Sequence, residues 1–185
     1  PRGQALKRHA SHMLQFRPGT DVSMLNAIMH VIVEEKLYDQ QYIEAYTENW
    51  EIEKAHLKTF TPEKMAKICG IDAETLRDVA RTFAGANAAM IFWGMGVSQH
   101  IHGTDNARCL ISLALMTGQI GRPGAGLHPL RGQNNVQGAS DAGLVPMFLP
   151  DYQPVSDDGV RSAFTEVWKS EDFSNKKGLT VIEIM

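Results

Sequence analysis

The stretch that decides the fold is Ala88-Ala-Met-Ile-Phe-Trp-Gly-Met-Gly-Val-Ser-Gln-His100. Its first six residues are apolar without a break, which is typical of a short strand buried on both faces. Two glycines follow, and Thr104 or Asp105 then stands where a helix N-cap belongs. Apolar residues lie almost all round the next helix, so we expect it to be buried between layers. Strand, glycine turn and buried helix together indicate an α/β fold.

The flanking sequence continues this alternation of helices and strands. Helices are predicted after Thr20 or Asp21, over residues 40–47, from Thr61-Pro62 to Gly70, from Asp72 to Gly85, and near 156–168. The first of them carries apolar residues at three- and four-residue steps: Leu25, Ile28, Met29 and Ile32. Further strands are predicted over residues 13–16 and 179–185. We therefore expect a mainly parallel sheet with helices beside it.

Composition excludes several classes of protein. The chain has 185 residues, 43% of them hydrophobic, which is enough for a core, and its net charge of −3 gives no basic field for nucleic acid. No apolar run is long enough to span a membrane. Cys69 and Cys109 lack metal-site spacing, so we expect inert thiols inside helices. The chain opens on Pro1 and stops on an apolar run, so we expect a piece of a longer polypeptide.

Charged residues are scarce in one long segment. Between Gly94 and Gly143 only five residues are charged, and ten of the sixteen glycines lie there. Residues 117–155 also lack clear helical or strand periodicity. A loop of that length in a compact protein is usually functional. The segment is therefore the expected place of a binding site.

The first candidate site is the turn from Gly94 to Gln99. Ligands of open α/β sheets bind at the carboxyl ends of strands, where glycines let backbone amides approach them. Gly94, Met95 and Gly96 stand at that place, but the next glycine, Gly103, comes too late for the fingerprint of NAD-binding proteins. Two interpretations stay open: the glycines contact a ligand, or they only turn a tight corner.

The second candidate site is the segment Arg131-Gly-Gln-Asn-Asn-Val-Gln137, one arginine among four carboxamides. Carboxamides both donate and accept hydrogen bonds, which suits a large heterocyclic ligand. Arg131 offers a rigid fork for a carboxylate or phosphate. The alternative is a loop whose amides satisfy its own backbone. The pair His100 and His102 lacks a third ligand nearby and is poor support for a metal site.

These motifs resemble those of molybdenum- or tungsten-dependent formate dehydrogenase catalytic (alpha) subunits, in the molybdopterin oxidoreductase family. The resemblance extends over essentially the whole chain. Its motifs are Trp93-Gly-Met-Gly-Val-Ser-Gln-His100, followed by Asn106-Ala-Arg108, then Thr117-Gly-Gln-Ile-Gly-Arg-Pro-Gly124 and His128-Pro-Leu-Arg-Gly-Gln-Asn-Asn-Val-Gln-Gly-Ala-Ser-Asp141. The segment from Arg131 to Gly138 is the most specific part, because the turn after Trp93 fits many molybdopterin oxidoreductases.

The resemblance implies a Rossmann-like parallel sheet with flanking helices, of which this chain is an incomplete piece of the molybdopterin-binding region. Residues 1–133 would belong to one α/β cofactor domain, and residues 134–185 would begin the adjoining one. In the family, two molybdopterin guanine dinucleotides hold one molybdenum or tungsten. A four-iron four-sulfur cluster and the metal-ligating cysteine or selenocysteine would lie outside this piece. Neither cysteine of this chain matches the metal-ligand motif, so no metal ligand is assigned here.

Site residues follow from the motif match. Met95, Gln99 and Gln133 would contact a dinucleotide, with Gly94 and Gly96 in the same turn. Arg131 would orient formate, which is oxidised to carbon dioxide while electrons leave through the iron–sulfur cluster. The implied partners are formate and electron-transfer subunits, with no nucleic acid and no membrane segment in this piece, and we expect a cytoplasmic location. The piece alone is expected to be inactive.

Two alternatives to formate oxidation stay open. One keeps the family and changes the reaction to that of a nitrate reductase or another oxo-transfer enzyme. The other is a non-catalytic nucleotide-binding or interaction module, in which the helices of residues 21–86 form a docking face and the glycine turn is purely structural.

Overall fold

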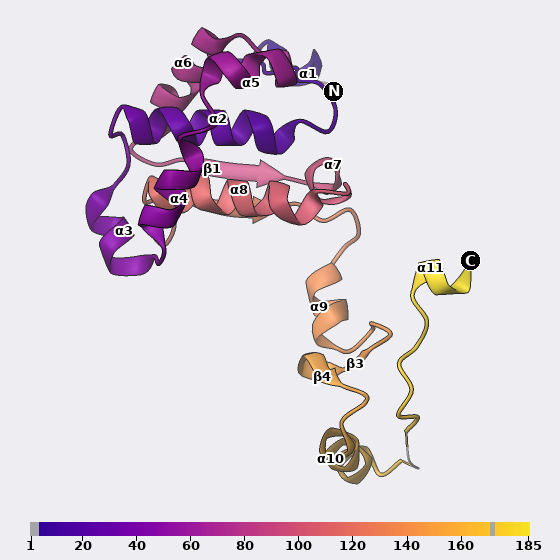
Figure 1. Cartoon of the computed structure of the whole chain (residues 1–185). Coiled ribbons are helices and arrows are strands. Elements are labelled where there is room, and N and C mark those ends of the chain that lie inside the picture. Colours follow the sequence, from indigo (N-terminus) through magenta and orange to yellow (C-terminus); the bar gives the residue numbers. More distant parts are fainter. Residues whose placement is uncertain (1–3, 171–172) are drawn as a thin grey trace. The chain divides into compact units, whose positions relative to one another are not determined.

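The computed structural model describes residues 4–170 and 173–185, and the chain divides into two units between Leu130 and Arg131. The first unit is mainly helical and contains one parallel pair of strands (Figure 1). Its elements are α1 Gln4–Lys7, α2 Asp21–Glu34, α3 Gln40–Tyr46, α4 Trp50–Leu57, α5 Pro62–Cys69, α6 Ala73–Ala84, β1 Met90–Trp93, α7 Met95–Ser98, α8 Gly103–Met116 and β2 Gly126–Pro129.

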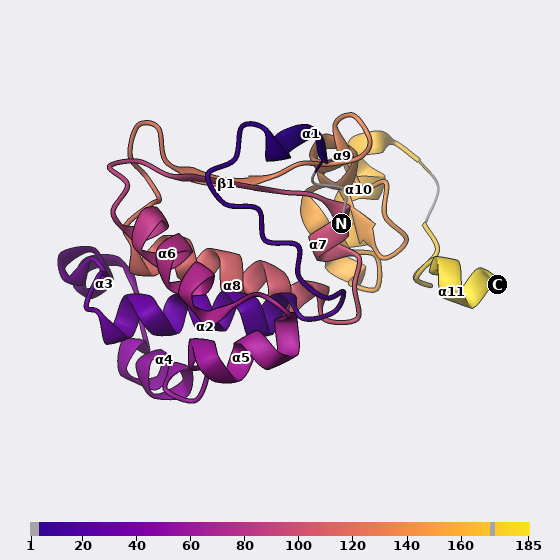
Figure 2. The ribbon, with the colours of Figure 1, turned by 90° about the horizontal axis from the view of Figure 1, so that it is seen from above.

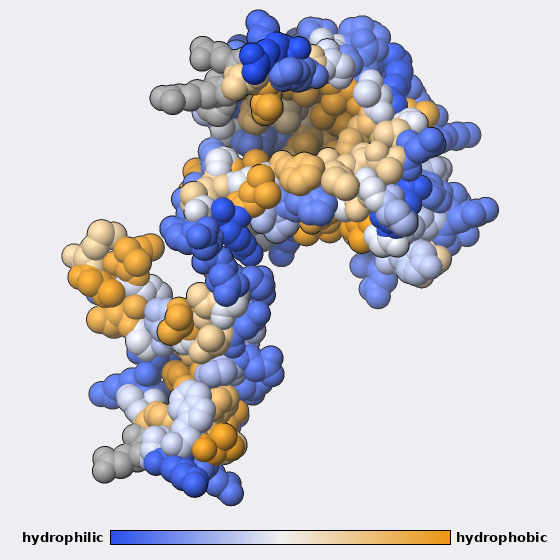
Figure 3. Space-filling view, turned by 180° about the vertical axis from the view of Figure 1, so that it is seen from behind, coloured by the Kyte–Doolittle hydropathy of each residue, from blue (hydrophilic) through white to orange (hydrophobic). Residues whose placement is uncertain are grey.

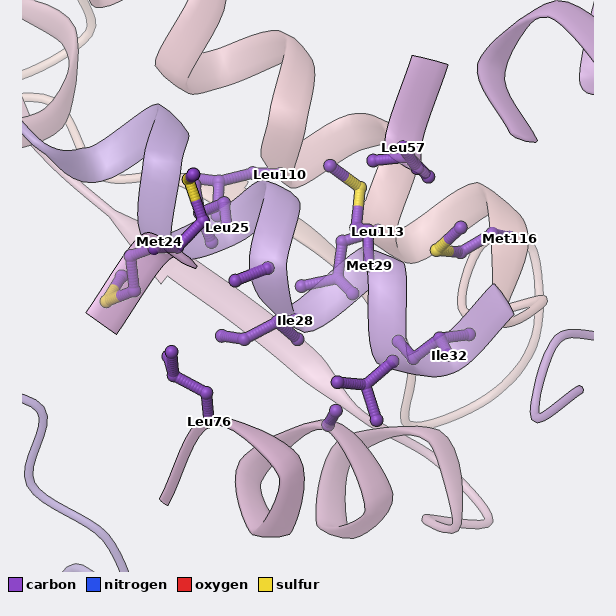
Figure 4. Packing of buried hydrophobic residues seen from close by; sticks show 14 of the residues in the cluster. Met24, Leu25, Ile28, Met29, Ile32, Leu57, Leu76, Leu110, Leu113 and Met116 are labelled. Carbon is purple, nitrogen blue, oxygen red and sulfur yellow. The ribbon is translucent and has the colours of Figure 1, made fainter. Parts of the chain in front are cut away.

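Helix α2 is the centre of the first unit. The apolar spacing that predicted it is confirmed, because its four periodic residues are all buried. It packs against α4, α5, α6 and α8. Figure 4 shows its side chains interleaved with those of neighbouring helices: Leu57 from α4, Leu76 from α6, and Leu110, Leu113 and Met116 from α8. Helix α2 is therefore surrounded by apolar neighbours, as the core of an α/β unit requires.

The ends of α5 and α6 follow the predicted signals. Thr61 caps α5 by accepting from the N–H of Lys64, and Pro62 takes the first helical position. Gly70 ends α5 at φ 80°, a left-handed conformation in which a side chain would be strained. Asp72 then accepts from the N–H of Thr75 and starts α6. These local signals explain why two short helices can form side by side, both packed against α2.

Strands β1 and β2 pair in parallel, with Met90 opposite Gly126 and Trp93 opposite Pro129. The connection between them runs through α7 and α8, which makes a βαβ unit. Figure 2 shows α2 and α8 on the same side of this pair, where Ile91 and Trp93 pack against the core. The expected α/β fold with a parallel sheet is confirmed, and in the part of the chain that the structure describes this sheet has two strands.

The prediction that β1 is buried on both faces is wrong for this chain. Its side chains alternate, and Met90 and Phe92 are 48% and 57% exposed. The cause is that the helices of the first unit cover one face of the strand pair only. Seen from behind, apolar residues gather on a hollowed face of the first unit (Figure 3).

Other expectations also need correction. Residues 13–16 form no strand, and residues 179–185 form the short helix α11, Val181–Ile184, because Thr180 and Glu183 make a reciprocal capping box. Helix α8 begins at Gly103, so its cap position is His102, two residues before the predicted cap Thr104. It is also not buried all round, since Ile111 is exposed.

The second unit, from Arg131 onward, consists of short elements: α9 Val136–Asp141, β3 Phe148–Leu149, the 3₁₀ helix η1 Pro150–Tyr152, β4 Gln153–Pro154, α10 Asp158–Trp168 and α11. Strands β3 and β4 pair antiparallel. The helix predicted near residues 156–168 is confirmed as α10, and Asp157 is its N-cap. Helices α4 and α9 were not predicted, because neither has an apolar stripe of useful length. Residues 117–155, expected to be a loop, also contain the short strands β2, β3 and β4, which are too short to show a clear alternation. In the parts of the chain that the structure describes, no helix is long and apolar enough to cross a membrane.

Gln119 fixes the entry into β1 from inside the fold. Its side chain is 1% exposed. Its Oε1 accepts from the N–H of Ala89 at 2.8 Å, and its Nε2 donates to the carbonyl of Ala86 at 3.2 Å. The buried carboxamide thus satisfies both backbone groups of the segment that leads into the strand.

We expect Gln119→Leu to lower the free energy of unfolding by about 1–3 kcal/mol, because it keeps the apolar bulk but leaves the half-buried Ala89 N–H and Ala86 carbonyl without their partner. Chemical denaturation of the chain measures the loss. The exposed Gln40→Leu is the control and should change stability by less than about 0.5 kcal/mol. Equal losses in the two variants would contradict the role given to Gln119.

Candidate functional site

The turn that follows β1 forms one helical turn, α7, at the carboxyl end of the strand. The N–H groups of Val97 and Ser98 donate to the carbonyl of Gly94, and that of Gln99 donates to Met95. The structure therefore brings together four residues singled out from the sequence: Gly94, Met95, Gly96 and Gln99.

Neither glycine of this turn is required by the fold of the chain. Gly94 has φ −135°, which any residue can adopt, and a Cβ there would lie 3.5 Å from the carbonyl of Leu130, an ordinary contact. A Cβ on Gly96 would meet no atom within 4 Å. The interpretation that both glycines only turn a tight corner thus finds no steric support in this chain.

The outer side of the turn is open. Met95 is 45% exposed, and Gln99 is exposed as well. A pocket of about 90 Å³ lies beside Gly96, lined also by Leu14, Gln15, Phe16, Pro18, Gly19, Asp21 and His100. Pockets that enclose a whole drug-sized ligand hold roughly 300–1,000 Å³. The turn is therefore suited to be one wall of a larger site rather than a complete pocket.

The inner side of the turn is held by Gly103 and Asn106, two residues to which the sequence analysis gave no role in the site. A Cβ on Gly103 would lie only 1.8 Å from the carbonyl oxygen of Ser98, so the chain needs glycine there. Asn106, on the next turn of α8, donates from Nδ2 to the carbonyl of Val97 at 2.9 Å. The signal that could have found Asn106 is a carboxamide among the apolar residues of a helix predicted to be buried.

Arg131 and Gln133 lie in the second unit, before α9. Both side chains are exposed. Neither makes a hydrogen bond or an ion pair with another described residue. The scarcity of acids in this segment explains why the Arg131 guanidinium has no carboxylate partner there. Their meeting with the turn after β1 in one site stays a prediction.

The alternative proposed for the carboxamide segment holds for two of its members. Asn135 caps α9 by accepting from the N–H of Gly138 at 3.1 Å, and Gln137 donates to Asp141 at 3.0 Å. The carboxamides of Asn135 and Gln137 therefore make their hydrogen bonds within the protein. In the parts that the structure describes, the side chains of Gln133 and Asn134 have no such partner, so they are the ones left for a ligand.

The first unit ends at the same sheet edge from which α7 starts. The N–H of Leu130 donates to the carbonyl of Trp93 at 2.6 Å, directly after the last paired residues of β1 and β2. Carboxyl ends of parallel strands meet at one edge of a sheet. The peptide bond to Arg131 therefore starts from the edge at which ligands of α/β sheets bind.

The cysteines and histidines offer no metal centre within the described ranges, since no three His, Cys, Asp or Glu side chains gather there. Cys69 is buried, as expected. Burial, helped by the charges of Glu53 and Asp105, raises the pKa of the Cys109 thiol to about 11. Cys109 thus stays protonated at neutral pH and is a poor metal ligand.

The family model described as molybdopterin oxidoreductase matches residues 2–184 of the chain. Over the whole chain, 43% of residues are identical to the F420-dependent formate dehydrogenase subunit alpha of Methanocaldococcus jannaschii, and 40% to formate dehydrogenase H of Escherichia coli. The chain spans 27% and 26% of the length of these two relatives.

Two further comparisons bear on the alternatives. A nitrate reductase of Synechocystis is 35% identical over 91% of the chain and 24% of its own length, a lower identity than that of the two formate dehydrogenases. Among solved structures, acetylene hydratase from Pelobacter acetylenicus matches 63% of the chain and 16% of its own, with a TM-score of 0.61 and 26% identity. The similarity therefore extends to the fold as well as to the sequence.

Gly96, on the open side of the α7 turn, and Gly103, on its buried side, should respond differently when a methyl group is added. Gly103→Ala should lower the free energy of unfolding by about 1–3 kcal/mol, because backbone must move to admit the Cβ. Gly96→Ala should leave it unchanged or raise it by up to about 1 kcal/mol, because alanine is the better helix former. Thermal unfolding of the two variants tests this, and equal effects would contradict it.

Proposed function

This chain belongs to the molybdopterin oxidoreductase family, and we propose that it forms part of the cofactor and substrate site in the catalytic subunit of a formate dehydrogenase. The observation that carries the proposal is the α7 turn. It combines two glycines that the chain itself does not need with an exposed methionine and glutamine. Such a turn leaves space and hydrogen-bonding groups for a flat heterocycle at the edge of the sheet.

A molybdopterin cofactor with molybdenum or tungsten follows from the family, and we propose its guanine dinucleotide form. The residues present fit such a group: the open space over Gly96, and the carboxamides of Gln99 and Gln133, suit ring nitrogens and carbonyls. When bound, this group supplies the two-electron acceptor for the reaction. Met95, Gln99 and Gln133 would hold it, with Gly94 and Gly96 giving it room.

Arg131 is proposed to bind the substrate. Formate is a small carboxylate, and a guanidinium can donate two parallel hydrogen bonds to it. The charge of Arg131 is not neutralised by another described residue, so it is free to bind an anion. Held in this way, formate would lose its freedom to turn, and its C–H could be kept in a fixed direction. Arg131 would thus bind and orient formate without exchanging a proton with it.

Formate is favoured over nitrate as the substrate by the identities of the relatives. The names of the two more similar relatives say formate dehydrogenase, and the nitrate reductase is less similar. The iron–sulfur cluster, the electron-transfer subunits and the cytoplasmic location remain part of the proposal. So does the division into a cofactor domain over residues 1–133 and the start of a second over residues 134–185.

The substitution Arg131→Ala is tested in the longer enzyme, that is, the formate dehydrogenase whose catalytic subunit is proposed to contain this chain. It should lower kcat/KM for formate by about 100- to 1,000-fold, the usual effect of removing a preorganised charge donor. Arg131→Lys keeps the charge but loses the fork, so it should recover only part of the activity. Steady-state kinetics with formate and with nitrate measures both. Arg108→Ala, which removes an exposed arginine paired with Asp105, is the control. An unchanged kcat/KM in Arg131→Ala would favour the non-catalytic module.

Met95→Ala and Gln99→Ala should act on the cofactor rather than on the substrate. We expect the metal and pterin bound per polypeptide to fall severalfold in the longer enzyme, while the KM for formate of the loaded fraction changes little. Metal analysis and pterin fluorescence give the content, and the exposed Gln40→Ala serves as the control. Full cofactor content in both Met95→Ala and Gln99→Ala would contradict the proposal that the α7 turn is a wall of the cofactor site.

A further inference from the structure

We propose that Asn106 is a positioning residue for the cofactor: it sets the α7 turn from the buried side, so that the open side presents Met95 and Gln99 in a fixed arrangement. The inference rests on the proposed function, because it concerns the same wall of the site. It assigns a role to a residue that lies outside the exposed part of the turn.

The burial of Asn106 is the first observation. Asn106 is the fourth residue of α8 and is 2% exposed. Asparagine is a poor helix former, and burial of a carboxamide is unfavourable unless hydrogen bonds compensate for the lost water. A leucine or alanine would suit a buried helical position better. The fold of α8 alone therefore gives no reason for asparagine here.

The second observation is the one hydrogen bond that this side chain makes in the described part of the chain. Its Nδ2 donates to the carbonyl oxygen of Val97 at 2.9 Å. Val97 belongs to α7, whose carbonyls have too few partners within so short a helix. The bond thus joins the body of α8 to the middle of the α7 turn.

A third observation is that two further contacts hold the turn from its buried side. The side chain of Val97 packs against the core cluster, and Gly103 lets α8 approach the carbonyl of Ser98 without a clash. Asn106 supplies the only side-chain hydrogen bond to the turn among the described residues. On the outer side, no side chain of the described residues forms a hydrogen bond with the side chain of Met95 or Gln99.

This division has a physical consequence for binding. A loop that must be ordered by its ligand lowers the affinity, because the ordering entropy opposes binding. A turn that is already fixed avoids this loss. Asn106 would therefore improve the retention of the cofactor without touching it, by keeping the turn in one conformation.

A positioning role differs from a general structural role in what the variant Asn106→Ala changes. Alanine is the best helix former, so α8 itself should not weaken. Loss of the bond to Val97 should act on the turn instead. We expect the N–H groups of Val97, Ser98 and Gln99 to exchange with deuterium about three- to tenfold faster in the 185-residue chain.

The matched control is Asn26→Ala. Asn26 is a buried asparagine on α2, 4% exposed, whose side chain accepts a weak bond from the Cys109 thiol. The substitution Asn26→Ala removes the same kind of side-chain amide from the core but leaves the contacts of α7 unchanged. Exchange at residues 97–99 should be unchanged in this control. Equal exchange at these residues in Asn106→Ala and the unsubstituted chain would overturn the inference.

Should Asn106→Ala not fold, Asn106→Asp takes its place, because it keeps the size of the side chain but sets an oxygen against the carbonyl of Val97. The same exchange measurement and the same control then apply. Faster exchange confined to residues 97–99 supports the inference, and unchanged exchange overturns it.

The cofactor content of the longer enzyme separates the inference from the function on which it rests. A severalfold loss of metal and pterin in Asn106→Ala and in Met95→Ala, but not in Asn26→Ala, supports both. A loss in Met95→Ala and Gln99→Ala with full content in Asn106→Ala overturns the positioning role alone. Full content in all these variants overturns the proposed function, and the inference with it.

Discussion

The packing of α2 against α8 is the contact on which the first unit depends. Leucine, isoleucine and methionine side chains of the two helices interleave in one apolar cluster, and each fully buried side chain of this size contributes about 1.5–3 kcal/mol. Because α8 is also the connection between β1 and β2, the same contact sets the strand pair and the turn between them. The turn proposed to bind the cofactor is thus held in place by an apolar contact in the core of the first unit.

Much of the fold could be predicted because its signals are local. The caps at Thr61 and Asp72, the left-handed Gly70 and the apolar steps of α2 all depend on neighbours within one helix, and the structure confirms them. Burial of β1 on both faces could not be judged in this way, since it depends on what covers Met90 and Phe92. Residues 179–185 have strand-like composition, yet a capping box made a helix of part of them.

Of the residues that form the α7 turn, only those on its exposed side could be assigned to a site from the sequence. Gly94, Met95, Gly96 and Gln99 stand in the sequence as a glycine turn after a strand, and the structure gathers them in α7. Gly103 and Asn106 act through close approach and a single hydrogen bond between neighbouring helices, which no spacing rule reveals. For the carboxamide segment, the structure separates Asn135 and Gln137, which bond within the protein, from Gln133 and Asn134.

The uncovered face of β1 has a consequence for anyone who prepares this stretch of polypeptide by itself. The ring centroids of Phe92 and His128 stack 4.8 Å apart, and Phe92 and Met90 form an exposed apolar surface on the strand pair. An exposed strand edge can also form hydrogen bonds with a strand of another molecule. At high concentration two copies can bury these surfaces against each other. Dilute samples and mild detergent would then keep the molecules apart long enough for spectroscopy.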